Sequence, residues 1–392
     1  MSYKYPLATS TWGQEEQDAI QRVIAEGIFT MGKNVLAFEN DFSKYINSKY
    51  CVMVNSGSSA ILLMIAALFY SKNDKFKLKR GDEVIVPAVS WSTTYYPLYQ
   101  YGLKIKFVDI DLNTLNYDLD QLEQAVTKET RVIMAVNLLG NPNDFFRIKK
   151  IINSRDILLL EDNCESMGAK FGDKYTGTFG IMGGFSTFFS HHISTMEGGL
   201  IVTDDEELYH ILLSLRAHGW TRNLPKYNLV CGEKSDDYFE ESFRFILPGY
   251  NLRPLEIAGA LGIEQVKRLP TLISERRKNA KLFQDTMINH PNLIIQKEIA
   301  ESSWFGFSLV IRPGSSLTRK VLLEKLNKIG FECRPIVAGN FAKNEVVKYF
   351  HSEIHGSLKN ADHIDQHGLF IGNHHYPMTE AVEVLKNLIS TK

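Results

Sequence analysis

A run of small residues marks the first place where this sequence could hold a ligand. Residues 54–60 read Val-Asn-Ser-Gly-Ser-Ser-Ala and lie between a short apolar strand and a strongly apolar helical segment. Small residues at a helix start leave backbone N–H groups open at the positive end of the helix dipole, which suits a phosphate. We therefore predict a phosphate site at Gly57 and Ser58, with a plain helix cap as the alternative.

Two acidic residues follow a second apolar strand. Residues 160–165 read Leu-Glu-Asp-Asn-Cys-Glu, and the strand ends where the acidic groups begin. Acidic groups at the carboxyl end of a parallel strand usually face a ligand crevice. Asp162 and Glu165 are therefore candidates for ligand contact, and a helix-capping role is the alternative for Asp162.

An aromatic residue and a pair of histidines complete the set of chemically capable groups. Trp91 follows another strand, where a flat ring could stack on a planar ligand or be buried in the core. His191 and His192 are adjacent, and neighbours in a loop or strand point apart, so they make a poor metal pair. An imidazole can move protons near neutral pH, but from the residues alone a structural role is the default interpretation of His191, and a structural role is expected for His192.

The elements that must position these groups alternate between helical patterns and short β-branched runs, which indicates an α/β fold with a mainly parallel sheet. The expected strands are Glu83–Pro87, Lys104–Asp109, Arg131–Asn137, Asp156–Glu161, Gly184–Phe189 and Gly199–Thr203. A helix is expected over Pro254–Leu269, and the pattern then changes to a charged helix over Thr271–Ile288. We predict a large domain over residues 1–269 and a smaller α+β domain over 270–392.

Bulk properties exclude several classes of function. The 392 residues carry 44 basic and 45 acidic side chains, a net charge of −1, which gives no reason to expect nucleic acid or an anionic membrane as partner. Four scattered cysteines without a Cys-x-x-Cys pair argue against a metal site, an iron–sulfur cluster or a disulfide framework, and fit a reducing cytoplasm. Residues 1–12 do not read as a signal peptide, and the longest apolar run is too short to span a bilayer.

The spacing around the histidines carries a family resemblance. Ser186 is followed by four residues, then His191, then five residues, then Glu197-Gly198-Gly199. This pattern resembles the cofactor segment of the DegT/DnrJ/EryC1/StrS sugar aminotransferases, in which a lysine stands at the position of His191. The resemblance extends over nearly the whole chain. It implies the aspartate-aminotransferase-like fold (fold type I), with pyridoxal 5′-phosphate (PLP) or its amine form, pyridoxamine 5′-phosphate (PMP), as cofactor.

The same resemblance implies roles for the cofactor-binding residues. Ser186 would join Gly57 and Ser58 at the cofactor phosphate, and Trp91 would stack on the pyridine ring. Asp162 would pair with the ring nitrogen and keep it protonated, so that the ring accepts electrons. Glu165 would lie on the cofactor's hydroxyl or amine side.

Two more segments resemble family segments. Residues 248–253 are similar to a Gly-Tyr-Asn-x-Arg segment whose asparagine, here Asn251, reaches the phosphate in the neighbouring subunit. That implies a homodimer with shared active sites. Residues 218–222 resemble an Arg-x-His-Gly region, which implies substrate contact for His218 and Arg222, with Arg222 on the diphosphate and a structural role as the alternative for His218.

The missing lysine decides which reaction the resemblance implies. A lysine amine bonds covalently to PLP, whereas an imidazole cannot but can carry protons. The chain is thus similar to family members that act as 3-dehydratases and remove the C3 hydroxyl of a nucleotide-linked 4-keto-6-deoxy sugar, and GDP is the nucleotide we expect. L-glutamate would restore PMP, and His191 would be the acid–base group. The alternatives are an aminotransferase using another lysine, a non-catalytic PLP-binding scaffold, and a nicotinamide dehydrogenase, for which no Gly-x-Gly-x-x-Gly sequence is found.

Overall fold

The apolar segments assemble into one eight-stranded sheet, in a computed structural model that describes residues 3–153 and 155–390. The strand order is β1–β9–β8–β5–β4–β2–β3–β15. The bounds are β1 Tyr50–Val54, β2 Glu83–Pro87, β3 Lys104–Val108, β4 Thr130–Val136, β5 Leu158–Asp162, β8 Met182–Ser186, β9 Gly199–Thr203 and β15 Ser352–Ile354. The expected mixed, mostly parallel sheet is therefore confirmed, although β8 ends three residues earlier than the sequence pattern suggested.

Strand direction determines where the site can form. Strand β9 is antiparallel to both of its neighbours, and the other pairs in this sheet are parallel. The carboxyl ends of β1, β2, β4, β5 and β8 therefore share one edge, which is where ligands bind in open α/β sheets.

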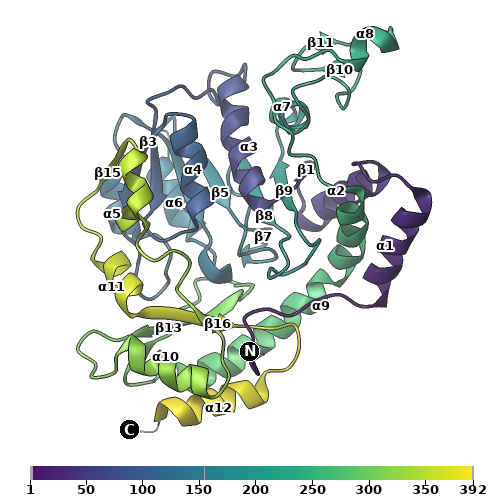
Figure 1. Cartoon of the computed structure of the whole chain (residues 1–392). Helices are drawn as coiled ribbons and strands as arrows, with labels where there is room; N and C mark the ends of the chain where they lie inside the picture. Colours follow the sequence, from purple (N-terminus) through teal and green to yellow (C-terminus); the bar gives the residue numbers. More distant parts are fainter. Residues whose placement is uncertain (1–2, 154, 391–392) are drawn as a thin grey trace.

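Helices cover both faces of this sheet (Figure 1). Alternate side chains of β2, β3 and β4 point to opposite faces, as strand geometry requires, and each set packs against its own helices. The helices of the large domain are α1 Gln14–Glu26, α2 Lys33–Ile46, α3 Gly57–Tyr70, α4 Ser92–Gln100, α5 Leu119–Ala125, α6 Phe145–Ile152 and α7 Glu206–Arg216. Helix α3 is buried along nearly its whole length and is accordingly apolar on almost all sides. It follows β1 directly, so its N-terminus lies at the carboxyl edge of the sheet.

One long helix connects the large domain to the small one. Helix α9 runs unbroken from Glu256 to Met287, so the expectation of two helices separated at Pro270 was wrong. Proline inside a helix removes a hydrogen bond and costs about 3 kcal/mol, and the packing of α9 against α1, α2 and the small domain offsets this cost. The expected domain boundary at 269/270 falls inside α9.

The small domain is a four-stranded antiparallel sheet flanked by helices (Figure 1). Its strands pair in the order β12–β13–β16–β14. The bounds are β12 Leu293–Ile294, β13 Gly306–Ile311, β14 Cys333–Arg334, β16 Gly368–Gly372, α10 Arg319–Lys328, α11 Lys359–His367 and α12 Thr379–Ser390. Strand β15 also comes from this part of the sequence but joins the edge of the large sheet beside β3.

The remaining helices and strands are short. An arm built from β10, β11 and α8 projects from the body beyond α7 (Figure 1). The remaining bounds are β6 Lys170–Phe171, β7 Lys174–Tyr175, β10 Tyr227–Asn228, β11 Gly232–Glu233, α8 Tyr238–Ser242, and the short 3-10 turns η1 Leu138–Gly140, η2 Phe341–Lys343 and η3 Glu345–Tyr349. In the part of the chain that the structure describes, no helix has both the length and the apolarity needed to cross a membrane.

Candidate active site

A cavity of about 750 Å³ opens at the carboxyl edge of the large sheet, between it and the small domain. Seven of the predicted site residues line it together: Gly57, Ser58, Trp91, Asp162, Glu165, Ser186 and His191. They lie at the ends of four strands, β1, β2, β5 and β8, or in the segments that follow them, and the sheet brings these ends to one edge. The structure thus gathers in one place residues that are up to 134 positions apart in the sequence.

The phosphate turn is built by close backbone approach. Ser56 caps α3 by accepting a hydrogen bond from the backbone N–H of Ser59 (3.1 Å). A Cβ on Gly57 would come within 2.7 Å of the Ser186 Cβ, and a Cβ on Gly199 within 2.2 Å of the Ser56 carbonyl oxygen. Glycine is therefore required at both positions for β8, β9 and the start of α3 to meet. The resulting cradle presents a helix N-terminus and the Ser186 hydroxyl to the cavity, which fits a phosphate group.

Asp162 is held by neutral donors. Its carboxylate accepts hydrogen bonds from the Thr94 hydroxyl (2.7 Å) and the Cys164 backbone N–H (3.2 Å). Burial raises the pKa of this carboxyl, and these hydrogen bonds only partly oppose that effect. A cationic group placed in the cavity would stabilise the carboxylate, so the site fits a protonated ring nitrogen.

Glu165 lies at the junction with the small domain. Its side chain accepts a hydrogen bond from the Leu139 backbone N–H (3.0 Å), and burial raises the pKa of Glu165 to about 7. Leu139 has a positive φ of 52°, and the next residue, Gly140, would place a Cβ 2.5 Å from the Trp304 backbone nitrogen. This strained turn is fixed by hydrogen bonds to Ser303 and Phe305, which precede β13.

His191 faces the cavity between aromatic rings. Its ring lies 5.1 Å from the Phe305 ring and 5.9 Å from the Phe188 ring, both edge-on. Burial and, to a smaller degree, the positive charge of Arg276 lower the pKa of His191 to about 4. The imidazole is therefore neutral at neutral pH and able to accept a proton. His192, by contrast, is fully buried and its Nε2 lies 3.2 Å from the Ser303 carbonyl oxygen.

Lysine is absent from the cavity. None of the described residues that line it is a lysine. Lys170 and Lys174, the nearest in sequence, lie on the β6–β7 hairpin over the rings of Tyr175 and Phe179. The alternative that another lysine replaces the missing one therefore has no support in the geometry.

Trp91 and the remaining predicted residues differ in placement. Trp91 is 57% exposed and lines the cavity, so the alternative of a buried core tryptophan was wrong.

Asn251, His218 and Arg222 do not line the cavity of the single chain. They form a separate cluster: Arg222 stacks on the Trp220 ring at 4.2 Å, and the His218 ring lies 5.0 Å from the same ring. Asn251 is exposed and accepts a hydrogen bond from Arg253 (2.9 Å).

Sequence reasoning missed several lining residues. Phe305, Arg334 and Phe370 come from the small domain, and Leu7 comes from the N-terminal segment. They follow no spacing pattern, so only the fold reveals them. Thr94 could have been found, since it stands three residues after Trp91 in the first turn of α4 and faces Asp162.

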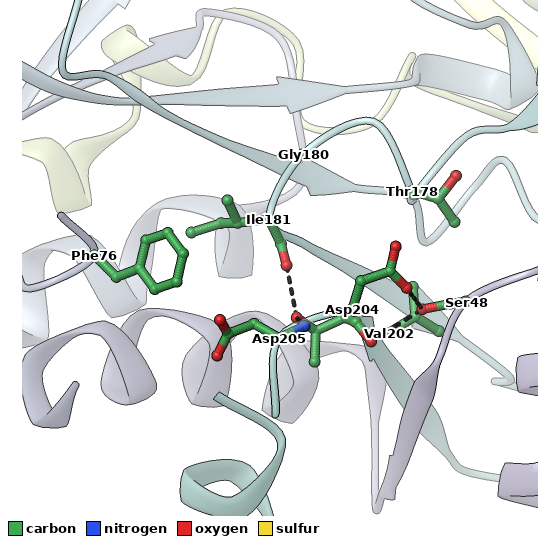
Figure 2. A pocket seen from close by; sticks show the side chains of 10 residues that line it. Ser48, Phe76, Thr178, Gly180, Ile181, Val202, Asp204 and Asp205 are labelled. Carbon is green, nitrogen blue, oxygen red and sulfur yellow. Dashed lines mark hydrogen bonds between the residues drawn. The ribbon is translucent and has the colours of Figure 1, made fainter. Parts of the chain in front are cut away.

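A second cavity, of about 280 Å³, lies at the opposite ends of β8 and β9 (Figure 2). Its polar side chains are already engaged: Asp204 accepts from Ser48 (3.1 Å), Thr203 donates to the Ile181 carbonyl (2.8 Å), and Asp205 caps α7. None of the site residues predicted from the sequence lines this cavity. The large cavity is therefore the candidate active site.

Comparisons with known proteins agree with this geometry. The sequence model of the DegT/DnrJ/EryC1/StrS aminotransferase family matches residues 10–389. A GDP-4-keto-6-deoxy-D-mannose 3-dehydratase of Escherichia coli O55:H7 is 62% identical over 386 residues, covering 98% of this chain and 99% of the relative.

Solved structures give the same result. An E. coli structure of GDP-4-keto-6-deoxy-D-mannose 3-dehydratase with bound hydrated PLP superposes with a TM-score of 0.98 at 61% identity, covering all of both chains. A structure of the 3-dehydratase with a trapped PLP–glutamate geminal diamine gives a TM-score of 0.97 at 61% identity, covering 99% of this chain and 100% of the other.

Proposed function

The chain belongs to the DegT/DnrJ/EryC1/StrS aminotransferase family, and from this premise we propose that it is a PLP/PMP-dependent lyase that removes the C3 hydroxyl of GDP-4-keto-6-deoxy-D-mannose. The observation that carries the proposal is His191, in a cavity whose described lining contains no lysine. The match to 3-dehydratases at 62% identity over 98% of the chain supports the substrate. The product, a 3,6-dideoxy-4-keto sugar, suits colitose and O-antigen synthesis for lipopolysaccharide, in the cytoplasm.

The residues of the cavity fit PLP and PMP. The cradle at Gly57, Ser58 and Ser186 would hold the phosphate, Asp162 the ring nitrogen, and Trp91 a face of the ring. When bound, the cofactor supplies an amine for the sugar ketone and a ring that accepts the electron pair left when a proton is removed.

His191 supplies the proton movement that this chemistry requires. Its Nδ1 faces the Ser190 hydroxyl at 3.5 Å, which leaves Nε2 as the atom that can reach the reacting groups. The neutral imidazole takes a proton beside the cofactor and can return it to the departing C3 hydroxyl, so that the C3–O bond breaks and water leaves. Phe188 and Phe305 restrict water around the imidazole. In the other half-reaction L-glutamate donates its amino group and leaves as 2-oxoglutarate.

Product analysis tests the proposal against its alternatives. The chain is incubated with PLP, L-glutamate and a panel of GDP-, CDP- and dTDP-linked 4-keto-6-deoxy sugars. A dehydratase releases ammonia and a 3-deoxy sugar, an aminotransferase yields a 4-amino sugar, and a scaffold yields neither. We expect the first result with the GDP-linked sugar, and a 4-amino product would contradict the proposal.

A matched pair of variants tests the role of His191. His191→Asn keeps the size of the side chain but cannot carry a proton, so with PMP preloaded it should bind the sugar and fail to eliminate the hydroxyl. His192→Asn changes the neighbouring imidazole, which is buried against Ser303, and should eliminate at close to the normal rate. Elimination by His191→Asn at the normal rate would show that another group moves the proton.

We further propose that the enzyme is a homodimer with shared sites. The projecting arm carries Tyr238, Phe239 and Phe243, which are 85%, 86% and 70% exposed (Figure 1). Aromatic side chains gathered on a projecting arm are typical of a surface that another chain covers. The cluster of Arg222 and Asn251 adjoins this arm, since Arg222 contacts Phe243 and Ser242. In a dimer, the same cluster of the other subunit would complete the cavity of this chain. Its arginine would contact the substrate diphosphate, and its asparagine would contact the cofactor phosphate.

Subunit mixing tests the shared site. Inactive Asn251→Ala chains mixed with inactive His191→Asn chains should recover activity, because one of the two hybrid sites contains both intact residues. The matched control mixes His191→Asn with Asp162→Asn, which line the same cavity, and should recover none. Absence of recovery in the first mixture, with subunit exchange demonstrated by mass spectrometry, would argue that each chain has a complete site.

A further inference from the structure

Arg276 is a buried cation without a carboxylate partner. It lies on α9, is 5% exposed, and donates hydrogen bonds to the carbonyl oxygens of Phe305 (3.1 Å) and Asn373 (2.7 Å). Among the described residues it forms no ion pair, and its Nε has no hydrogen-bond partner. Burial lowers the pKa of Arg276 to about 10. Buried charges are normally paired, so an unpaired one calls for an explanation.

The hydrogen bonds of Arg276 fix a segment that contacts His191. The Asn373 side chain donates to the carbonyl oxygens of Arg276 (3.0 Å) and Trp304 (2.9 Å), which ties α9, the segment before β13 and the loop after β16 together. Phe305, held by Arg276 through its carbonyl, places its ring 5.1 Å from the His191 ring. Arg276 therefore influences the position of the His191 imidazole through Phe305, which contacts both residues.

The charge of Arg276 also acts on the imidazole. It is the second cause, after burial, of the lowered pKa of His191, and it acts in the same direction on His192 and His374. Other charged groups line the same cavity, namely Asp162, Glu165, Glu197, Glu332 and Arg334. Glu332 and Arg334 are paired with each other at 2.8 Å. Burial and this arginine both lower the pKa of His191, so both favour the neutral imidazole.

We propose that Arg276 is a positioning residue for His191: it fixes the segment whose Phe305 ring packs against the imidazole, and its buried charge disfavours a second positive charge there. This inference rests on the proposed function for the imidazole's role in elimination. The neighbouring Arg277 provides a matched control. It also bonds to backbone carbonyls, those of Ser302 and Gly168, but it is partly exposed and pairs with Glu301 at 3.3 Å.

The test compares pH profiles of single-turnover elimination with PMP preloaded. Elimination requires the neutral imidazole, so the rate falls at acidic pH as His191 becomes protonated. Arg276→Gln keeps a donor but removes the charge, so the pKa of His191 should rise and this acidic limb should move to higher pH. Arg276→Lys keeps the charge and should leave the limb in place while lowering the rate. Arg277→Gln should leave the limb unchanged.

Nuclear magnetic resonance of the cofactor-free protein gives a readout that needs no reaction. The imidazole of His191, labelled with ¹⁵N and assigned by its loss in His191→Asn, should titrate near pH 4 in the unaltered chain and at a higher pH in Arg276→Gln. Equal values in the two proteins would overturn the inference. If Arg276→Gln does not fold, a value at or above 6.5 in the unaltered chain would overturn it as well. Failure of the proposed function would instead appear as missing ammonia release with the titration intact.

Discussion

Replacing Asp162 by asparagine tests the electrostatic centre of the site. The carboxylate is buried and accepts hydrogen bonds only from neutral groups, Thr94 and the Cys164 backbone. Its charge is therefore available to a cation in the cavity. Two opposite charges about 4 Å apart attract by about 4 kcal/mol at an effective dielectric constant of 20. Removing one should lower kcat by about 10³-fold, within a range of roughly 10²–10⁴.

The assay must separate this effect from loss of cofactor or of folding. Turnover of Asp162→Asn is measured as ammonia release at saturating PLP and L-glutamate, with the melting temperature determined in parallel. Asp109→Asn is the control, because Asp109 is equally buried but accepts hydrogen bonds from the backbone N–H groups at the start of α11. The control should lower the melting temperature and keep kcat. Near-normal turnover of Asp162→Asn, or an equal fall in both variants, would refute the assigned role.

Three further predictions concern pH, the cofactor cradle and the core. Burial raises the pKa of Glu165 to about 7, so the folded chain retains a proton that the unfolded chain loses near pH 4.5. The free energy of unfolding should therefore fall as the pH rises from about 4.5 to 7, by at most about 3 kcal/mol. Glu165→Gln should remove this pH dependence in urea unfolding of the cofactor-free protein. Gly57→Ala places a Cβ 2.7 Å from that of Ser186 and should raise the Kd for PLP at least about tenfold in a fluorescence titration. Arg216→Met leaves Glu39 buried and unpaired and should cost about 3–5 kcal/mol of unfolding free energy with unchanged m-value.

The parts of the site that the sequence predicted share one property: a local turn fixes their geometry. Ser186 and His191 are joined by four residues that leave β8, so their spacing along the chain translates directly into a spacing in the cavity. Asp162 ends β5, and Gly57 begins α3 three residues after β1 ends; these strands end at a common edge of the sheet. Spacing rules of this kind identify a residue without knowledge of its distant neighbours.

The parts that were missed depend on contacts between distant segments. Phe305 and Arg334 reach the cavity only because α9 continues through Pro270 and places the small sheet opposite the large one. The proline suggested a helix end, because local propensity disfavours it, but packing along the whole helix outweighed that propensity. Strand β15 has only three residues, too few for an alternating pattern, and its place beside β3 follows from pairing rather than from sequence.

The absence of a lysine changes what the rest of the cavity must do. A lysine would hold the cofactor covalently and add a positive charge beside Asp162 and Glu165. Without it, the cofactor would be retained only by noncovalent contacts, so under the roles proposed above the cradle at Gly57 and the charge of Asp162 would contribute a larger share of its binding than in a lysine-containing relative. In the proposed mechanism a protonated His191 would be unable to act as a base, and burial together with the charge of Arg276 keeps its pKa low. Arg276 is not among the described residues that line the cavity, so it would add this positive charge without offering an amine that could recapture the cofactor.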